Sequence, residues 1–235
     1  MKSEMIKQNI AEIRAKIEAA AIEAGRDPKE ITLVGASKMN DSAACRAAIA
    51  AGIDVLGENR VQEMLSKHKD GAYEGAPLHF IGHLQRNKVK QVVGVVDLIQ
   101  SVGSLELLEM INKQAEKLGI VQKILLEVNI GGEEAKSGFA PDEVYAAAEK
   151  AKELAHVSLR GLMTIPPVET EPHGNMGYFT KVHTLYVDIN ENLYDNELEY
   201  LSMGMSGDFA DAIACGANMV RVGTAIFGKR NYAQV

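Results

Sequence analysis

A lysine stands directly after the first β-rich apolar run of the sequence, and its amine is the first candidate for covalent chemistry. Lys38 shares alternating parity with Thr32, Val34 and Ala36, so these side chains fall on one face of an extended strand. If that face lines the inside of a closed sheet, burial lowers the pKa of the amine and makes it a usable nucleophile. A solvated lysine at a strand end is the alternative, and it is the commoner situation for this residue type.

An arginine stands inside the last apolar run, where its charge needs a partner. Arg221 shares parity with Met219 and Gly223. Burying an unpaired charge is costly, so the guanidinium must face either a carboxylate of the protein or a ligand nitrogen or anion. The sequence leaves both interpretations open.

The residues after this run are suited to binding a phosphate. Gly223 and Thr224 form a predicted turn at the strand end, where many barrels hold a phosphate through backbone N–H groups. Ser206, after the preceding strand, offers a hydroxyl at the start of a helix predicted to begin near 207–209. Capping that helix is the simpler role for Ser206, although such a hydroxyl can also serve a phosphate.

Other chemistries are disfavoured by spacing and by charge. His79 and His83 are four residues apart, but no cysteine or carboxylate completes a tetrahedral set nearby, so no metal site is expected. The basic stretch 86–90 lacks interleaved aromatic residues and indicates a solvated helix face. Since 25 Lys and Arg stand against 32 Asp and Glu, with a formal net charge of −7, nucleic acid is not expected as a partner.

These side chains must be positioned by the elements that carry them. Short apolar runs predict eight strands, at 31–36, 55–57, 78–81, 98–101, 124–130, 159–165, 200–203 and 219–222. Helical periodicity fills the intervals, including one helix over 85–95, and a further helix occupies 3–24. Strict alternation implies parallel strands with right-handed crossovers. The pattern predicts an α/β fold, a (β/α)8 TIM barrel with an additional N-terminal helix.

An open doubly wound sheet is the alternative architecture. Such a sheet usually carries a glycine-rich phosphate loop after its first strand, where this chain has Ser37 and Lys38. No linker-like stretch interrupts the alternation, so residues 1–235 are expected to form a single domain.

The composition predicts a cytoplasmic protein. No run of 18 apolar residues is present, so no membrane span is expected, and the first twenty residues mix charges of both signs without an apolar signal core. Cys45 and Cys215 lie far apart in alanine-rich segments and form no disulfide framework, as in a reducing compartment.

Seven segments together resemble the pyridoxal-phosphate homeostasis proteins, which are single-domain barrels related to the N-terminal domain of alanine racemases. The segments run in family order at 35–38 (GASK), 57–63 (GENRVQE), 79–88 (HFIGHLQRNK), 128–138 (VNIGGEEAKSG), 161–167 (GLMTIPP), 201–206 (LSMGMS) and 219–228 (MVRVGTAIFG). One segment alone is weak evidence, whereas seven in order are highly specific. The chain departs from the family at three places. Residues 39–41 read Met-Asn-Asp where family members more often carry Thr-Lys-Pro, Leu78 stands where tryptophan is common, and Gly103 stands where aspartate is usual.

The resemblance implies a binding site for pyridoxal 5′-phosphate (PLP). The implied cofactor-binding residues are Lys38, Asn59, His83, Ser206, Arg221, Gly223 and Thr224. In this set Lys38 holds PLP as a Schiff base, and Arg221 faces the pyridine nitrogen. The phosphate is received by Ser206, Gly223 and Thr224, while the other two residues lie around the cofactor mouth.

The function that follows is non-enzymatic PLP binding in intracellular PLP homeostasis, as a carrier or regulator that affects amino-acid and vitamin B6 balance. PLP-dependent apo-enzymes are the candidate recipients. An arginine opposite the ring nitrogen disfavours protonation of that nitrogen and so weakens the ring as an electron sink.

The alternative is a PLP-dependent amino-acid racemase. Racemases of the alanine type carry a Tyr-Gly loop after the lysine and a second domain with a tyrosine base, and neither 39–41 nor the remaining length supplies these. A phosphosugar-type barrel enzyme that works without PLP is a third and weaker interpretation.

Overall fold

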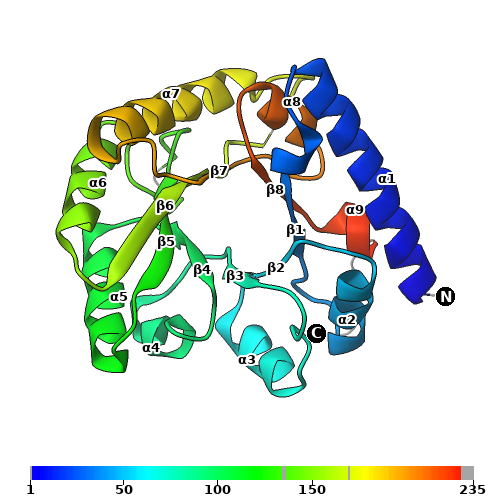
Figure 1. Cartoon of the computed structure of the whole chain (residues 1–235), viewed down its shortest axis with the longest axis horizontal. Helices are drawn as coiled ribbons and strands as arrows, with labels where there is room; N and C mark the ends of the chain where they lie inside the picture. The colour runs from blue at the N-terminus through cyan, green and yellow to red at the C-terminus, as the bar shows by residue number, and fades with distance from the viewer. Residues whose placement is uncertain (1, 134–135, 169, 229–235) are drawn as a thin grey trace.

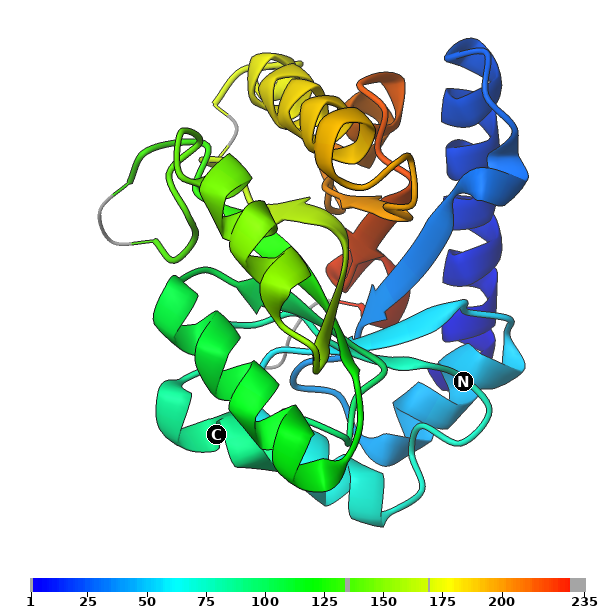
Figure 2. The same cartoon turned by 60° about the vertical axis from the view of Figure 1, so that its left-hand side comes forward.

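A closed barrel of eight parallel strands forms the centre of the molecule, and the helices lie outside it (Figures 1 and 2). The computed structural model describes residues 2–133, 136–168 and 170–228. In chain order the strands are β1 (Thr32–Ala36), β2 (Val55–Glu58), β3 (Leu78–Phe80), β4 (Leu98–Val102), β5 (Gln122–Val128), β6 (Val157–Thr164), β7 (Tyr200–Ser202) and β8 (Met219–Val222). The predicted (β/α)8 barrel is confirmed.

The helices follow the strands around the outside of the barrel. They are α1 (Lys2–Glu23), α2 (Ser42–Ala50), α3 (Val61–Lys69), α4 (Val89–Val92), α5 (Leu105–Leu118), α6 (Val144–Glu153), α7 (Met176–Leu193), α8 (Phe209–Ala214) and α9 (Thr224–Phe227), with 3-10 helices η1 (Pro28–Glu30) and η2 (Arg86–Lys88). No helix among the described residues is both long and apolar enough to cross a membrane.

The additional N-terminal helix is a structural part of the barrel wall. Its buried residues are Ile6, Ile10, Ile13, Ile17 and Ala21, which recur every three or four positions and so form one stripe. This stripe packs against α2, α8 and α9, and Figure 1 shows α1 along the outside of the strands where β8 meets β1. The helix therefore covers the seam at which the barrel closes.

The strands are buried on both faces. Side chains of one parity point outward and form the core shared with the helices, while those of the other parity fill the barrel. The inner cluster consists of Val34, Val55, Leu98, Leu125, Met163 and Met219. Val34, which shares parity with Lys38, therefore lies on the face that lines the barrel.

The segment 85–95 differs from the single helix predicted for it. A 3-10 helix at Arg86–Lys88 leads into the one-turn α4, after which Val93 is extended and Gly94 has a φ of 81°. Valines at 89, 92, 93 and 96 are all buried and have the i, i+3, i+4, i+7 spacing of a helical stripe, which explains the prediction of one helix, but the left-handed backbone at Gly94 ends the helix after one turn. The β-branched side chains also lower helix propensity. The predicted turn at Gly223-Thr224 likewise contains one turn of helix, α9.

Candidate functional site

The residues singled out in the sequence lie at the carboxyl end of the barrel strands. Lys38 follows β1, Asn59 follows β2, Ser206 follows β7, and Gly223 follows β8. Closure of the barrel brings the first and last strands together, with Val34 of β1 opposite Arg221. The carboxyl end is where barrels of this type carry their active sites.

Gly223 and the segment before Lys38 are direct neighbours. A Cβ atom built on Gly223 would lie 3.3 Å from the carbonyl oxygen of Ala36 and 3.4 Å from its Cβ, so a larger residue at 223 would crowd the end of β1. Strand pairing therefore places the predicted phosphate turn beside the end of β1, two residues before the predicted nucleophile.

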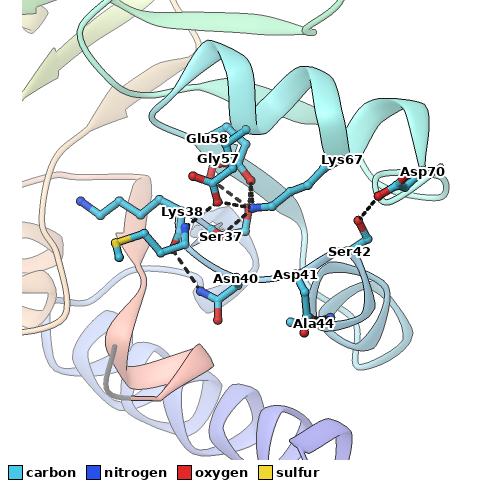
Figure 3. Close-up of polar contacts among 12 residues, drawn as sticks. Ser37, Lys38, Asn40, Asp41, Ser42, Ala44, Gly57, Glu58, Lys67 and Asp70 are labelled. Carbon is cyan, nitrogen blue, oxygen red and sulfur yellow. Dashed lines mark hydrogen bonds and ion pairs between the residues drawn. The ribbon is translucent and has the colours of Figure 1, made fainter. Parts of the chain in front are cut away.

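Lys38 is half-buried and stands in a tightly held loop. Its carbonyl accepts a hydrogen bond from Asn40 Nδ2 at 3.1 Å, and the next residue, Met39, has a φ of 61°. A left-handed backbone at a non-glycine residue is uncommon and marks a position fixed by its surroundings. Figure 3 shows the Lys38 side chain extending away from the buried pair Glu58 and Lys67.

Arg221 points into the barrel and is held by neutral groups. Its two terminal nitrogens donate to Ser202 Oγ at 2.6 Å and to the Thr164 carbonyl at 2.8 Å. Burial lowers the pKa of Arg221 to about 10, and the charges of Glu127 and Asp208 oppose this shift. The guanidinium therefore keeps its charge at neutral pH. It forms no ion pair within the described parts of the chain, so the carboxylate partner that the sequence left open is not observed.

A chain of buried side chains orients Arg221. Ser202 Oγ accepts from the guanidinium and donates to Gln100 Oε1 at 2.7 Å. Gln100 Nε2 lies 2.9 Å from His79 Nδ1. Gln100 is not among the site residues predicted from the sequence, although a glutamine between the apolar residues Leu98 and Val102, and of the same parity, is a signal that could have found it.

His79 at the end of this chain is buried and neutral, which predicts a pH-dependent stability. Burial lowers the pKa of His79 to about 4 from 6.5. Because the unfolded chain binds a proton more readily, the contribution of the neutral imidazole is present above about pH 6.5 and is lost as the pH falls toward 4. We expect the unfolding free energy of the wild type, relative to His79→Gln, to fall by about 2–3 kcal/mol between about pH 7.5 and pH 4.5 in urea titrations. A difference that does not change with pH would contradict a neutral buried His79.

Ser206 does not cap the helix that follows it. The N-cap of α8 is Asp208, whose carboxylate accepts from the Met205 N–H at 2.7 Å, and Ser206 is exposed. The capping role considered for Ser206 was wrong because the chain enters the helix two residues later. Thr224 is also exposed, as the first residue of α9. Both hydroxyls are thus accessible from solvent.

Asn59 and His83 line a shared cavity of about 500 Å³ at the mouth. The Asn59 side-chain oxygen is buried and has no hydrogen-bond partner within the described residues. Its backbone is fixed by close packing, since a Cβ on Gly82 would lie 2.2 Å from the Asn59 carbonyl oxygen. His83 is exposed at the rim of the cavity. An unsatisfied buried polar atom in a residue that lines a cavity calls for a partner, such as a ligand or a water.

Glu127 is a further lining residue of this cavity that sequence reasoning missed. It is 7% exposed, and Ser137 Oγ donates to its Oε2 at 3.0 Å. Burial raises the pKa of Glu127, while Ser137, Arg221 and His83 oppose the shift. Glu127 directly precedes the motif at 128–138, and two positions of that motif, Glu134 and Ala135, lie outside the described residues.

Known proteins resemble this chain over nearly its whole length. The family described as "Alanine racemase, N-terminal domain" matches residues 3–231. A pyridoxal phosphate homeostasis protein of Aquifex aeolicus is 42% identical over 225 residues, which cover 96% of this chain and 98% of that protein. PipY of Synechococcus elongatus superposes with a TM-score of 0.85 at 33% identity in its structure without PLP, over 95% of this chain and all of PipY. Its structure with PLP bound gives 0.82 at 32% identity, with the same coverage.

The identity and the coverage decide the family independently of any single motif. The seven ordered segments found in the sequence are consistent with this result. The chain belongs to the pyridoxal phosphate homeostasis protein family, within the alanine racemase N-terminal domain family.

Proposed function

We propose that this protein binds PLP at the carboxyl end of the barrel and acts in intracellular PLP homeostasis as a carrier or regulator, with residues 1–235 as a single PLP-binding domain. The observation that carries the proposal is the pairing of β1 with β8, which sets Gly223 against Ala36, two residues before Lys38. The relative PipY holds PLP in one of its structures.

The residues at the mouth fit PLP. Lys38 offers an amine for the aldehyde, and Arg221 offers a charged group for the ring nitrogen. The exposed hydroxyls of Ser206 and Thr224, with the backbone of Gly223, are suited to the phosphate. The unsatisfied oxygen of Asn59 supports the fit, because a bound molecule in the adjoining cavity would give it a partner. His83, on the rim of the same cavity, completes the proposed set.

Each residue has a defined task in this mechanism. When bound, PLP supplies an aldehyde that condenses with an amine, with loss of one water, and a ring that can act as an electron sink. Lys38 provides the amine. Arg221 keeps its own proton and would place a positive charge near the ring nitrogen, which would disfavour a second proton there. Ser202 and the Thr164 carbonyl hold the guanidinium in that orientation.

This arrangement favours binding and release over amino-acid catalysis. With an unprotonated ring nitrogen the electron sink is weak, and inversion at an α-carbon needs an acid and a base on opposite faces. Lys38 is the one base that we assign to the site. We therefore propose a non-catalytic role, with PLP-dependent apo-enzymes as recipients of the cofactor.

The experiment that tests this function measures turnover. Protein loaded with PLP is incubated with a panel of L-amino acids, and D-enantiomers and keto acids are followed by chiral chromatography. We expect PLP to remain bound and no product to form at an enzyme-like rate. Robust turnover that disappears in Lys38→Ala would instead support the racemase alternative.

Two further measurements serve as controls for ligand identity. The visible absorption spectrum of PLP, recorded as the protein is added, separates a PLP protein from a phosphosugar enzyme. Only a protein that binds PLP through an amine is expected to shift the absorption of the cofactor. Pyridoxal, which lacks the phosphate, is expected to bind much more weakly than PLP because Ser206, Gly223 and Thr224 then have no anion to hold. Equal affinities would show that the phosphate position is wrong.

A further inference from the structure

A buried cluster of charged side chains lies behind the segment that carries Lys38, and the PLP proposal makes no use of it. Lys67 on α3 is 5% exposed, and Glu58 at the end of β2 is fully buried. Lys67 Nζ lies 2.7 Å from Glu58 Oε1 (Figure 3). It also lies 2.7 Å from Glu63 Oε1. Taking charges out of water is expensive, so a buried cluster of this kind is weak evidence for a stability role alone.

The cluster contacts the backbone on both sides of Lys38. The third hydrogen bond of Lys67 Nζ goes to the carbonyl of Ser37 at 2.9 Å. Glu63 Oε1, which accepts from Lys67, also accepts from the Met39 N–H at 2.5 Å. An ammonium has three N–H donors, and all three are used here. Lys67 therefore holds the residue before Lys38 directly, and the residue after it through Glu63.

Ser37 ties the same segment to β2. Its hydroxyl donates to Glu58 Oε1 at 2.5 Å, and its N–H donates to the Gly57 carbonyl at 2.9 Å. Tyr73 also donates to Glu58 Oε1, at 3.0 Å. A shift of the peptide groups around Lys38 would break several hydrogen bonds to charged groups, which are the strong ones.

Electrostatics keep the cluster assembled and keep its lysine unreactive. Burial by itself lowers the pKa of Lys67, but Glu58 and Glu63 raise it and the net shift is upward. Burial raises the pKa of Glu58, against the opposing effect of Lys67. A protonated amine with three acceptors has no lone pair for an aldehyde, so Lys67 is not itself a site of attachment.

We propose that Lys67, Glu58 and Glu63 form a brace that positions Lys38 for covalent attachment of PLP. The brace acts through the backbone at Ser37 and Met39 and does not touch the cofactor. This inference rests on the proposed attachment at Lys38, where the amine adds to the aldehyde carbon and a C=N bond forms as one water leaves. The brace residues come from β2 and α3, so the second barrel unit sets the geometry of the first.

The test compares attachment rates in variants that remain folded. Lys67→Met removes the ammonium and Glu63→Ala removes the acceptor of the Met39 N–H, whereas Glu63→Gln keeps an acceptor oxygen there. Lys69→Met, at an exposed position of the same helix, is the matched control. Urea unfolding first shows which variants fold. PLP is then added to the folded variants, and samples taken over time are quenched with borohydride. Peptide mapping quantifies the label at Lys38, and the total amount of bound PLP is measured in the same samples.

We expect attachment to slow by about tenfold or more in Lys67→Met and Glu63→Ala, since small misplacements of a reacting group cost rate. Glu63→Gln should recover most of the rate, and Lys69→Met should match the wild type. Folded Lys67→Met and Glu63→Ala proteins that attach PLP at the wild-type rate would overturn the brace. If Lys67→Met does not fold, the two Glu63 variants decide. A wild type that attaches no PLP at Lys38 would overturn the proposed function instead.

Discussion

Lys38→Ala is expected to lose all borohydride-stable attachment of PLP. Lys38 is the lysine at the end of β1, beside the Gly223 turn, in a loop held by the Asn40 side chain and by the proposed brace. Without its amine no C=N bond forms there, and bound PLP would be held by its phosphate and ring contacts alone. The measurement is the visible absorption of the PLP-loaded protein, followed by borohydride reduction and peptide mapping.

Lys136 provides the sharpest control for this assignment. It lines the cavity that Asn59 and His83 share, so its amine is an alternative site of attachment. Lys136 Nζ contacts the carboxylate of Glu133 and donates a hydrogen bond to the carbonyl of Pro166. Both contacts favour the protonated amine, which cannot attack an aldehyde. Lys136→Ala should therefore leave attachment at Lys38 intact. Label on Lys136 in the wild type would defeat the assignment.

Arg221→Ala is expected to weaken PLP binding by about 10-fold to 100-fold while leaving the protein folded, because a hydrogen bond to a charged group contributes about 1.5–3 kcal/mol. The structure explains why the fold survives. The hydrogen-bond partners left behind are the Ser202 hydroxyl and the Thr164 carbonyl, both neutral, so no direct ion pair among the described residues is broken, and the buried Glu127 and Asp208 lose only a nearby positive charge. We expect the free energy of unfolding to fall by about 2 kcal/mol. PLP titration and urea unfolding of the same samples measure the two effects.

Arg160→Ala separates cofactor binding from a general effect on the barrel. Arg160 lies in the first half of β6, away from the carboxyl end of the strand, and forms an ion pair with Glu199. Its loss should lower stability without changing PLP affinity. Equal losses of affinity in the Arg160 and Arg221 variants would show that Arg221 acts through the fold and not through the cofactor.

The sequence determined the architecture because the signals for it are local. Each strand is a short apolar run and each helix has its own periodicity, so all eight strands and α1 were found without knowledge of their neighbours. The alternation also predicted the face of Val34, which lines the barrel, since parity along a strand is a local property. The failures were local as well. In 85–95 the buried valines have helical spacing, yet the left-handed backbone at Gly94 ends the helix after one turn. At Ser206 the helix start depends on backbone angles that the residue types do not specify.

The contacts that surround Lys38 and Arg221 were decided by the tertiary structure. Gln100 and Ser202 are 102 residues apart and meet only because β4 and β7 both line the closed barrel. Lys67 is one of 25 basic residues in the chain, and nothing in its neighbourhood marks it as the one that reaches Ser37. Such pairs depend on barrel closure, which joins segments distant in sequence. Periodicity reports which face of an element is buried, but it does not report which side chain of another element lies opposite.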